Sequence, residues 1–301
     1  MKRSLMRNSP SALAALAAIA VSTLTSLAFA QTANSLMATK PVAPTTTDVA
    51  TSGFDKSDVA AAAQTKNVTE LQLSAGGITS SGNSKLLAVT GSGRFKARRD
   101  DNQLSLNLAG NYAESAPDPD EDMETSLQNV QGKVRYDRFF GKGFAGFLSL
   151  SGRNDRFQGL VLRTNLDPGL AYYFIDREKQ QLWTEVGYDA QFDLRRDEAL
   201  NKAAKDGIVL DKTETRHSTR LFVGYNGSIN SLVGVTTGLE YLQGLPKTEY
   251  WRLNWDLGLT AALSHKFSLA TTFSLRYDHT PLPSVKNTDT VTAVNLVYQL
   301  L

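Results

Sequence analysis

The chain has 301 residues, of which 41% are hydrophobic and 21% charged, and its 32 basic and 30 acidic residues give a net charge of +2. This balance excludes a strongly basic nucleic-acid-binding protein. The absence of cysteine excludes disulfides, thiol nucleophiles and thiolate metal sites, and three histidines are too few for a histidine-rich metal centre. A mean hydropathy of −0.26 argues against a bundle of transmembrane helices, which needs several apolar runs of about 20 residues.

The first 30 residues have the pattern of an export signal. Lys2, Arg3 and Arg7 precede an apolar stretch over residues 12–29, and small residues occupy the last and third-last positions before Gln31. The alternative is an uncleaved anchor, but polar residues within the stretch and the small-residue ending favour cleavage. We therefore predict that residues 1–30 are a signal peptide cleaved near Ala30.

Residues 31–66 are rich in Thr, Ala, Ser and Pro and show no sustained hydrophobic period. Such a segment buries too little apolar area to order itself, which predicts a flexible periplasmic arm. Residues 58–64 favour a short helix, and a periplasmic plug is the alternative to a flexible arm.

The remaining chain, residues 67–301, alternates apolar and polar residues with a period of two, which is typical of β-strands. In the clearest run, Leu104, Leu106 and Leu108 alternate with Ser105 and Asn107. Turn residues separate the runs. We predict about twelve strands, over residues 69–79, 85–98, 103–114, 127–138, 144–154, 163–175, 181–192, 216–226, 231–242, 250–262, 267–278 and 289–300.

The connections between these strands favour an antiparallel up-and-down transmembrane β-barrel. Even-numbered connections are tight, whereas odd-numbered ones are longer on average, as in outer-membrane barrels with short periplasmic turns and longer external loops. The first and fifth connections are short although this orientation makes them external. Strands of about eleven residues exceed the usual length in soluble proteins, which disfavours the alternative of a soluble sandwich or lipocalin-like barrel. Residues 193–215 are predicted to be a loop.

Aromatic residues on the apolar face gather near the strand ends, as expected where rings meet lipid headgroups. Five of them are predicted to form an external girdle: Tyr112, Tyr188, Tyr241, Trp251 and Tyr277. A periplasmic girdle is predicted from Phe95, Phe144, Phe174, Phe267 and Tyr298, together with Tyr225.

Several segments resemble a known family. LSAGGITSSGNS over residues 73–84, KVRYDRFF over 133–140, GRNDRFQGL over 152–160 and DPGLAYYFID over 167–176 resemble the YdiY-like salt-induced outer-membrane proteins, catalogued as domain of unknown function 481. The resemblance covers roughly residues 70–301. It implies an outer-membrane barrel of uncharacterised role with a link to salt or osmotic stress, and it supplies no catalytic residues.

Charged residues fall on the inward faces of the predicted strands. The candidates for lining the lumen are Arg94, Lys96, Lys133, Arg135, Asp137, Arg163, Glu185, Asp189, Arg220, Arg252, Asp256 and Arg276. They could line a water-filled pore, or pair with one another in a narrow, closed lumen. Both signs occur in similar numbers, which favours the closed lumen, although a barrel of this size is compatible with either.

Two groups of residues suggest catalysis or metal binding. A hydrolase at the outer rim would use His217 with Ser218, or Asp278 with His279, but neighbouring residues on a strand project to opposite faces. An acidic loop over residues 118–124 offers oxygen ligands for calcium, yet it lacks the spacing of a calcium-binding loop and is predicted to be solvated. No catalytic, metal or cofactor site is therefore expected.

These observations predict an all-β outer-membrane protein of a Gram-negative bacterium, acting as a small channel or a structural element of the envelope. A rim hydrolase is the alternative. The expected partners are outer-membrane lipid, lipopolysaccharide and the outer-membrane assembly machinery, with no nucleic acid.

Overall fold

A computed structural model describes residues 67–81, 85–116, 120, 122–141, 143–177, 180–205, 207–281 and 286–300. The predicted signal peptide, arm and short helix, over residues 1–66, lie outside this described part. Among the described residues, no helix has the length and apolarity needed to span a membrane.

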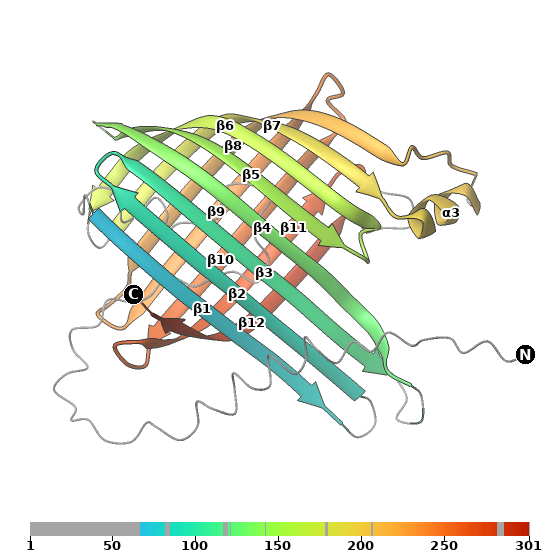
Figure 1. Ribbon diagram of the computed structural model, residues 1–301, viewed down its shortest axis with the longest axis horizontal. Helices are drawn as coiled ribbons and strands as arrows, with labels where there is room; N and C mark the ends of the chain where they lie inside the picture. The colour runs from blue at the N-terminus through green and yellow to red at the C-terminus, as the bar shows by residue number, and fades with distance from the viewer. Residues whose placement is uncertain are drawn as a thin grey trace, which may run out of the picture. The chain divides into compact units, whose positions relative to one another are not determined.

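The described residues form a closed antiparallel barrel of twelve strands, which confirms the predicted fold class (Figure 1). Each strand pairs with its neighbours in the sequence, and β1 pairs with β12 to close the ring. The strands are β1 Asn67–Ser80, β2 Lys85–Arg99, β3 Asn102–Ala116, β4 Glu124–Gly141, β5 Phe144–Asp155, β6 Leu160–Arg177, β7 Gln180–Arg195, β8 Thr213–Ser228, β9 Val233–Leu245, β10 Trp251–Ala262, β11 Phe267–Asp278 and β12 Thr288–Gln299.

The barrel has two different ends. We call the end that carries the connections after β2, β4, β6, β8 and β10 the turn end, and the end that carries the other connections the loop end. Because consecutive strands run in opposite directions, the last residues of odd-numbered strands and the first residues of even-numbered strands meet at the loop end.

One connection at the loop end differs from the prediction. Residues 193–215 are not a continuous loop, because β7 extends to Arg195, β8 begins at Thr213, and helix α3 occupies Asp197–Lys205. Acidic residues in the first turn of α3 and lysines in its last turn complement the helix dipole. Gly207, with a φ of 76°, follows the helix in the left-handed conformation that favours glycine. Nine residues are too few to produce a hydrophobic period that stands out in the sequence.

Apolar side chains cover the outside of the barrel, and charged side chains fill the inside. On β3, Leu104 and Leu108 are 45% and 55% exposed, whereas Ser105 and Asn107 are buried. On β4, Val134 is exposed between the buried Lys133 and Arg135. Soluble proteins have the opposite distribution, so this exterior is suited to lipid.

This exterior generates a prediction about depth in the bilayer. Val186 is 54% exposed near the middle of β7, and Leu245 is 44% exposed at the loop end of β9. We expect Val186→Arg to lower the free energy of unfolding by about 2–4 kcal/mol, and Leu245→Arg by about 0–1 kcal/mol, because the cost of a cation falls towards the interface. Urea unfolding of the barrel in lipid vesicles measures both values. Equal costs at the two positions would contradict a lipid-facing exterior.

Candidate functional site

The interior of the barrel is the candidate site, because the charged side chains gather there. Of the twelve residues predicted to face the lumen, ten are buried and two, Arg163 and Arg276, are partly exposed. The ten are Arg94, Lys96, Lys133, Arg135, Asp137, Glu185, Asp189, Arg220, Arg252 and Asp256.

Five of the interior charges form one continuous network, which we call the ion-pair layer: Arg135, Asp137, Glu185, Arg220 and Glu240. Arg135 contacts Asp137 at 2.8 Å and Glu185 at 3.0 Å. Arg220 contacts Glu185 at 2.7 Å, through an oxygen that also accepts a hydrogen bond from Arg135, and Glu240 at 2.8 Å. Each arginine therefore lies between two carboxylates, and Glu185 joins β4 to β8 across the interior.

The ion-pair layer is shielded from solvent. All five side chains are at most 2% exposed. Removing charges from water is costly, and mutual attraction compensates only when the geometry is good and further hydrogen bonds are made. Here Glu240 also accepts a hydrogen bond of 2.6 Å from Asn254 Nδ2. Removing a single member would leave the other charges buried with fewer partners.

An aromatic cluster lies between the ion-pair layer and the turn end of β4 to β8. It contains Phe147, Tyr173, Trp183 and Phe222, packed with two alanines. The two groups are in contact, because the Arg135 guanidinium lies 4.0 Å from the centre of the Phe147 ring. Trp183 Nε1 also donates a hydrogen bond of 3.3 Å to Glu185.

Sequence reasoning missed the aromatic cluster. Its members share the inward face with charges that were recognised, since Trp183 lies two residues before Glu185, and Phe222 two residues after Arg220. The alternation therefore assigns these rings to the interior, as it does the charges. Gly224 makes room for the indole: a Cβ at that position would overlap the Trp183 ring.

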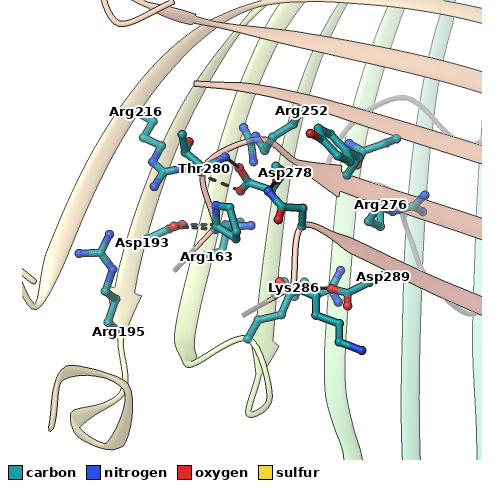
Figure 2. Close-up of a pocket in the computed structure, with 16 residues that line it drawn as sticks. Arg163, Asp193, Arg195, Arg216, Arg252, Arg276, Asp278, Thr280, Lys286 and Asp289 are labelled. Carbon is teal, nitrogen blue, oxygen red and sulfur yellow. Dashed lines mark hydrogen bonds and ion pairs between the residues drawn. The ribbon is translucent and has the colours of Figure 1, made fainter. Parts of the chain in front are cut away.

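Six arginines converge at the loop end, around a cavity of about 80 Å³ that we call the arginine vestibule (Figure 2). They are Arg153, Arg163, Arg195, Arg216, Arg252 and Arg276. Each lies close to the loop end of its strand, so the antiparallel order brings together residues spread over more than a hundred positions of the chain. Lys286 and three aspartates, Asp193, Asp278 and Asp289, also line the cavity.

The predicted girdle residues, including Tyr225, lie on the outside of the barrel. At the loop end, the Trp251 ring lies 6.1 Å from Tyr241 and 4.8 Å from Tyr277. At the turn end, the rings of Phe267 and Tyr298 are 4.8 Å apart. The other predicted members on the outside are Tyr112, Tyr188, Phe95, Phe144 and Phe174.

The candidate hydrolase residues do not assemble in the described part of the chain. His217 Nδ1 lies 2.6 Å from the Tyr188 hydroxyl on the outside, whereas Ser218 is buried inside. The His279 ring stacks on Trp251, with ring centres 5.1 Å apart. Asp118 and Glu121 of the acidic loop lie outside the described residues. Among the residues that the structure describes, no three His, Asp or Glu side chains are arranged to hold a metal ion.

Comparison with known proteins gives a family match. The profile described as "Protein of unknown function, DUF481" matches residues 73–300. None of the curated proteins matches the chain in sequence.

Several solved structures resemble the chain at low identity. The NanC porin is 11% identical with a TM-score of 0.47, covering 77% of this chain and 100% of the porin. The COG4313 outer membrane channel from Pseudomonas putida F1 is 10% identical with a TM-score of 0.43, covering 77% and 95%. The translocator domain of the autotransporter NalP from Neisseria meningitidis is 11% identical with a TM-score of 0.42, covering 81% and 93%.

The ion-pair layer generates a prediction about stability. In Glu185→Gln, Arg135 and Arg220 would each keep one carboxylate but lose the one they share. We expect the free energy of unfolding in lipid vesicles to fall by about 3 kcal/mol, at the low end of the cost of breaking a buried pair.

The matched control is the exposed pair of Lys212 and Asp197, which lies within the connection that carries α3. Asp197→Asn should cost about 0–1 kcal/mol, because water already solvates both groups. A similar cost for the two variants would mean that the interior pairs are as well solvated as the exposed pair.

Proposed function

The chain belongs to the DUF481 family, and we propose that it is an outer-membrane barrel that serves the envelope with its lumen closed by ion pairs. Its loop end faces the exterior and its turn end the periplasm. The apolar exterior and the aromatic rings near both ends support a barrel that spans the bilayer. The longer connections at the loop end support its exterior orientation.

The observation that carries the closed lumen is the position of Arg220. Its side chain is fully buried between Glu185 and Glu240, and all three are at most 1% exposed. In an open, water-filled pore these charges would be hydrated. The aromatic cluster adds bulky side chains next to the same layer, on the side of the turn end. The alternative role, a small channel, requires a water path past these groups.

Planar-bilayer recording tests the closed lumen. We expect no conductance steps from the refolded wild-type barrel. The double variant Arg220→Ser with Glu240→Ser removes one cation and one anion, so the net charge of the interior is unchanged and Glu185 keeps Arg135. We expect this variant to give reproducible steps, because two long side chains are replaced by short ones in the same layer.

Heat-modifiable migration on a gel shows that each protein has folded before it is recorded. The double variant Lys212→Ser with Asp197→Ser, which removes an exposed pair at the loop end, is the control and should remain silent. Reproducible steps from the folded wild type would overturn the closed lumen and establish the small channel.

Association with the outer membrane and with salt stress can be tested in the bacterium that makes the protein. We propose that the mature protein contacts lipid and lipopolysaccharide after insertion by the outer-membrane assembly machinery. The resemblance to salt-induced proteins supports a rise in its amount when salt is added to the medium. We expect recovery in the outer-membrane fraction, and a larger amount after added sodium chloride than in unsupplemented medium.

A non-ionic osmolyte at equal osmolarity separates an ionic signal from an osmotic one. An amount that is unchanged under both treatments would remove the stress link. Recovery in the soluble periplasmic fraction would contradict the membrane assignment independently of the stress result.

A further inference from the structure

The arginine vestibule is lined by cationic side chains that take no part in closing the lumen. Its wall carries six arginines and Lys286 against three aspartates. The lumen is closed by the ion-pair layer, whose members do not line this cavity. The arginines at the loop end are therefore not explained by closure of the barrel.

Carboxylates hold several of these arginines in place. Arg163 makes a two-pronged contact with Asp193, at 2.8 Å and 2.7 Å, as the dashed lines in Figure 2 show. Arg276 contacts Asp256 at 2.7 Å, and Arg252 contacts Asp189 at 3.3 Å. Asp256 and Asp189 do not line the cavity, so they balance the charge from behind while the guanidinium groups remain at the wall. Groups fixed in this way lose little conformational entropy when they bind a ligand.

Arg195 and Arg216 have few acceptors between them, and Arg195 donates a hydrogen bond of 2.7 Å to the carbonyl oxygen of Asp211. Both contact the same carboxylate, that of Glu214, which lies 2.9 Å from Arg216. The next carboxylate, Asp278, is 3.9 Å from Arg216, too far for a hydrogen bond. The Nε atoms of Arg195 and Arg216 are buried and have no hydrogen-bond partner in the part of the chain that the structure describes. Both side chains line the vestibule, so an oxyanion in the cavity would bring further acceptors to two cations that share one carboxylate.

The geometry points to an oxyanion as that ligand: we propose that the vestibule binds a small organic anion through a carboxylate or phosphate group held by Arg195 and Arg216. A guanidinium group presents parallel N–H donors that match the paired oxygens of such groups. A second cavity of about 180 Å³ shares Arg216, Arg252 and Asp278 with the vestibule and adds Tyr250, which gives space for the remainder of the molecule.

Isothermal titration calorimetry on the refolded full barrel in detergent tests this site, with inorganic phosphate and citrate as probes. We expect saturable binding of at least one probe, and a Kd about tenfold or more higher in Arg216→Gln, because a charge-assisted hydrogen bond is lost. Arg216→Lys keeps the charge without the paired donors, and it should also bind more weakly. Arg138→Gln removes an exposed arginine at the turn end and should bind like the wild type.

Vesicles that contain lipopolysaccharide separate the two sources of the anionic group. Binding of phosphate or citrate identifies a small solute, whereas binding of these vesicles alone, lost in Arg216→Gln, identifies a lipid phosphate. Both results support an oxyanion site. No saturable binding to any probe would overturn it, as would equal affinities of the wild type and both Arg216 variants, provided that the proteins show heat-modifiable migration.

Discussion

The constraint that shapes the whole structure is that lipid cannot hydrogen-bond to polar groups. The backbone groups and charged side chains of a barrel with an apolar outside must therefore find their partners within the protein. Lipid offers no water to an unpaired strand edge, so an up-and-down sheet with this exterior must close. Closure takes place between β1 and β12, where residues 72–75 pair with residues 296–299, and Leu300 N donates to the carbonyl oxygen of Leu71. Fourteen residues of β1 pair with β2, so the closing seam is the shorter of the two edges of β1.

The same requirement applies to the side chains inside. Because the outside is reserved for apolar residues, the charged residues share a confined interior, where each is stable only with partners. The ion-pair layer meets this condition with alternating arginines and carboxylates. The aromatic cluster fills the neighbouring space with side chains that need few polar partners. Trp183 donates a hydrogen bond to Glu185, and the Phe147 ring packs against the guanidinium of Arg135.

On the side of β4 to β8, the interior therefore changes in character along the barrel axis, from aromatic near the turn end, through paired charges, to arginine-rich at the loop end. The same residue type has two different environments. Arg220 lies between two carboxylates of the ion-pair layer, whereas Arg195 and Arg216 share the carboxylate of Glu214 and line a cavity. This difference is the reason for separating a role in closure from a role in ligand binding. The two can be altered independently, since they involve different side chains.

Much of this architecture follows from local sequence patterns. The period of two marks all twelve strands and assigns each side chain to the inside or the outside, because successive residues on a strand face opposite ways. Helix α3 was missed because nine residues carry little periodic signal. The aromatic cluster was missed because the alternation assigns a side chain to the inside or the outside of the barrel but does not indicate which side chains it contacts. Which charges meet could not be read from the sequence. Arg135 and Glu185 are 50 positions apart, and Arg252 and Asp189 are 63 apart. These contacts arise from the stagger and closure of the whole ring, which determine the height of each side chain inside the barrel.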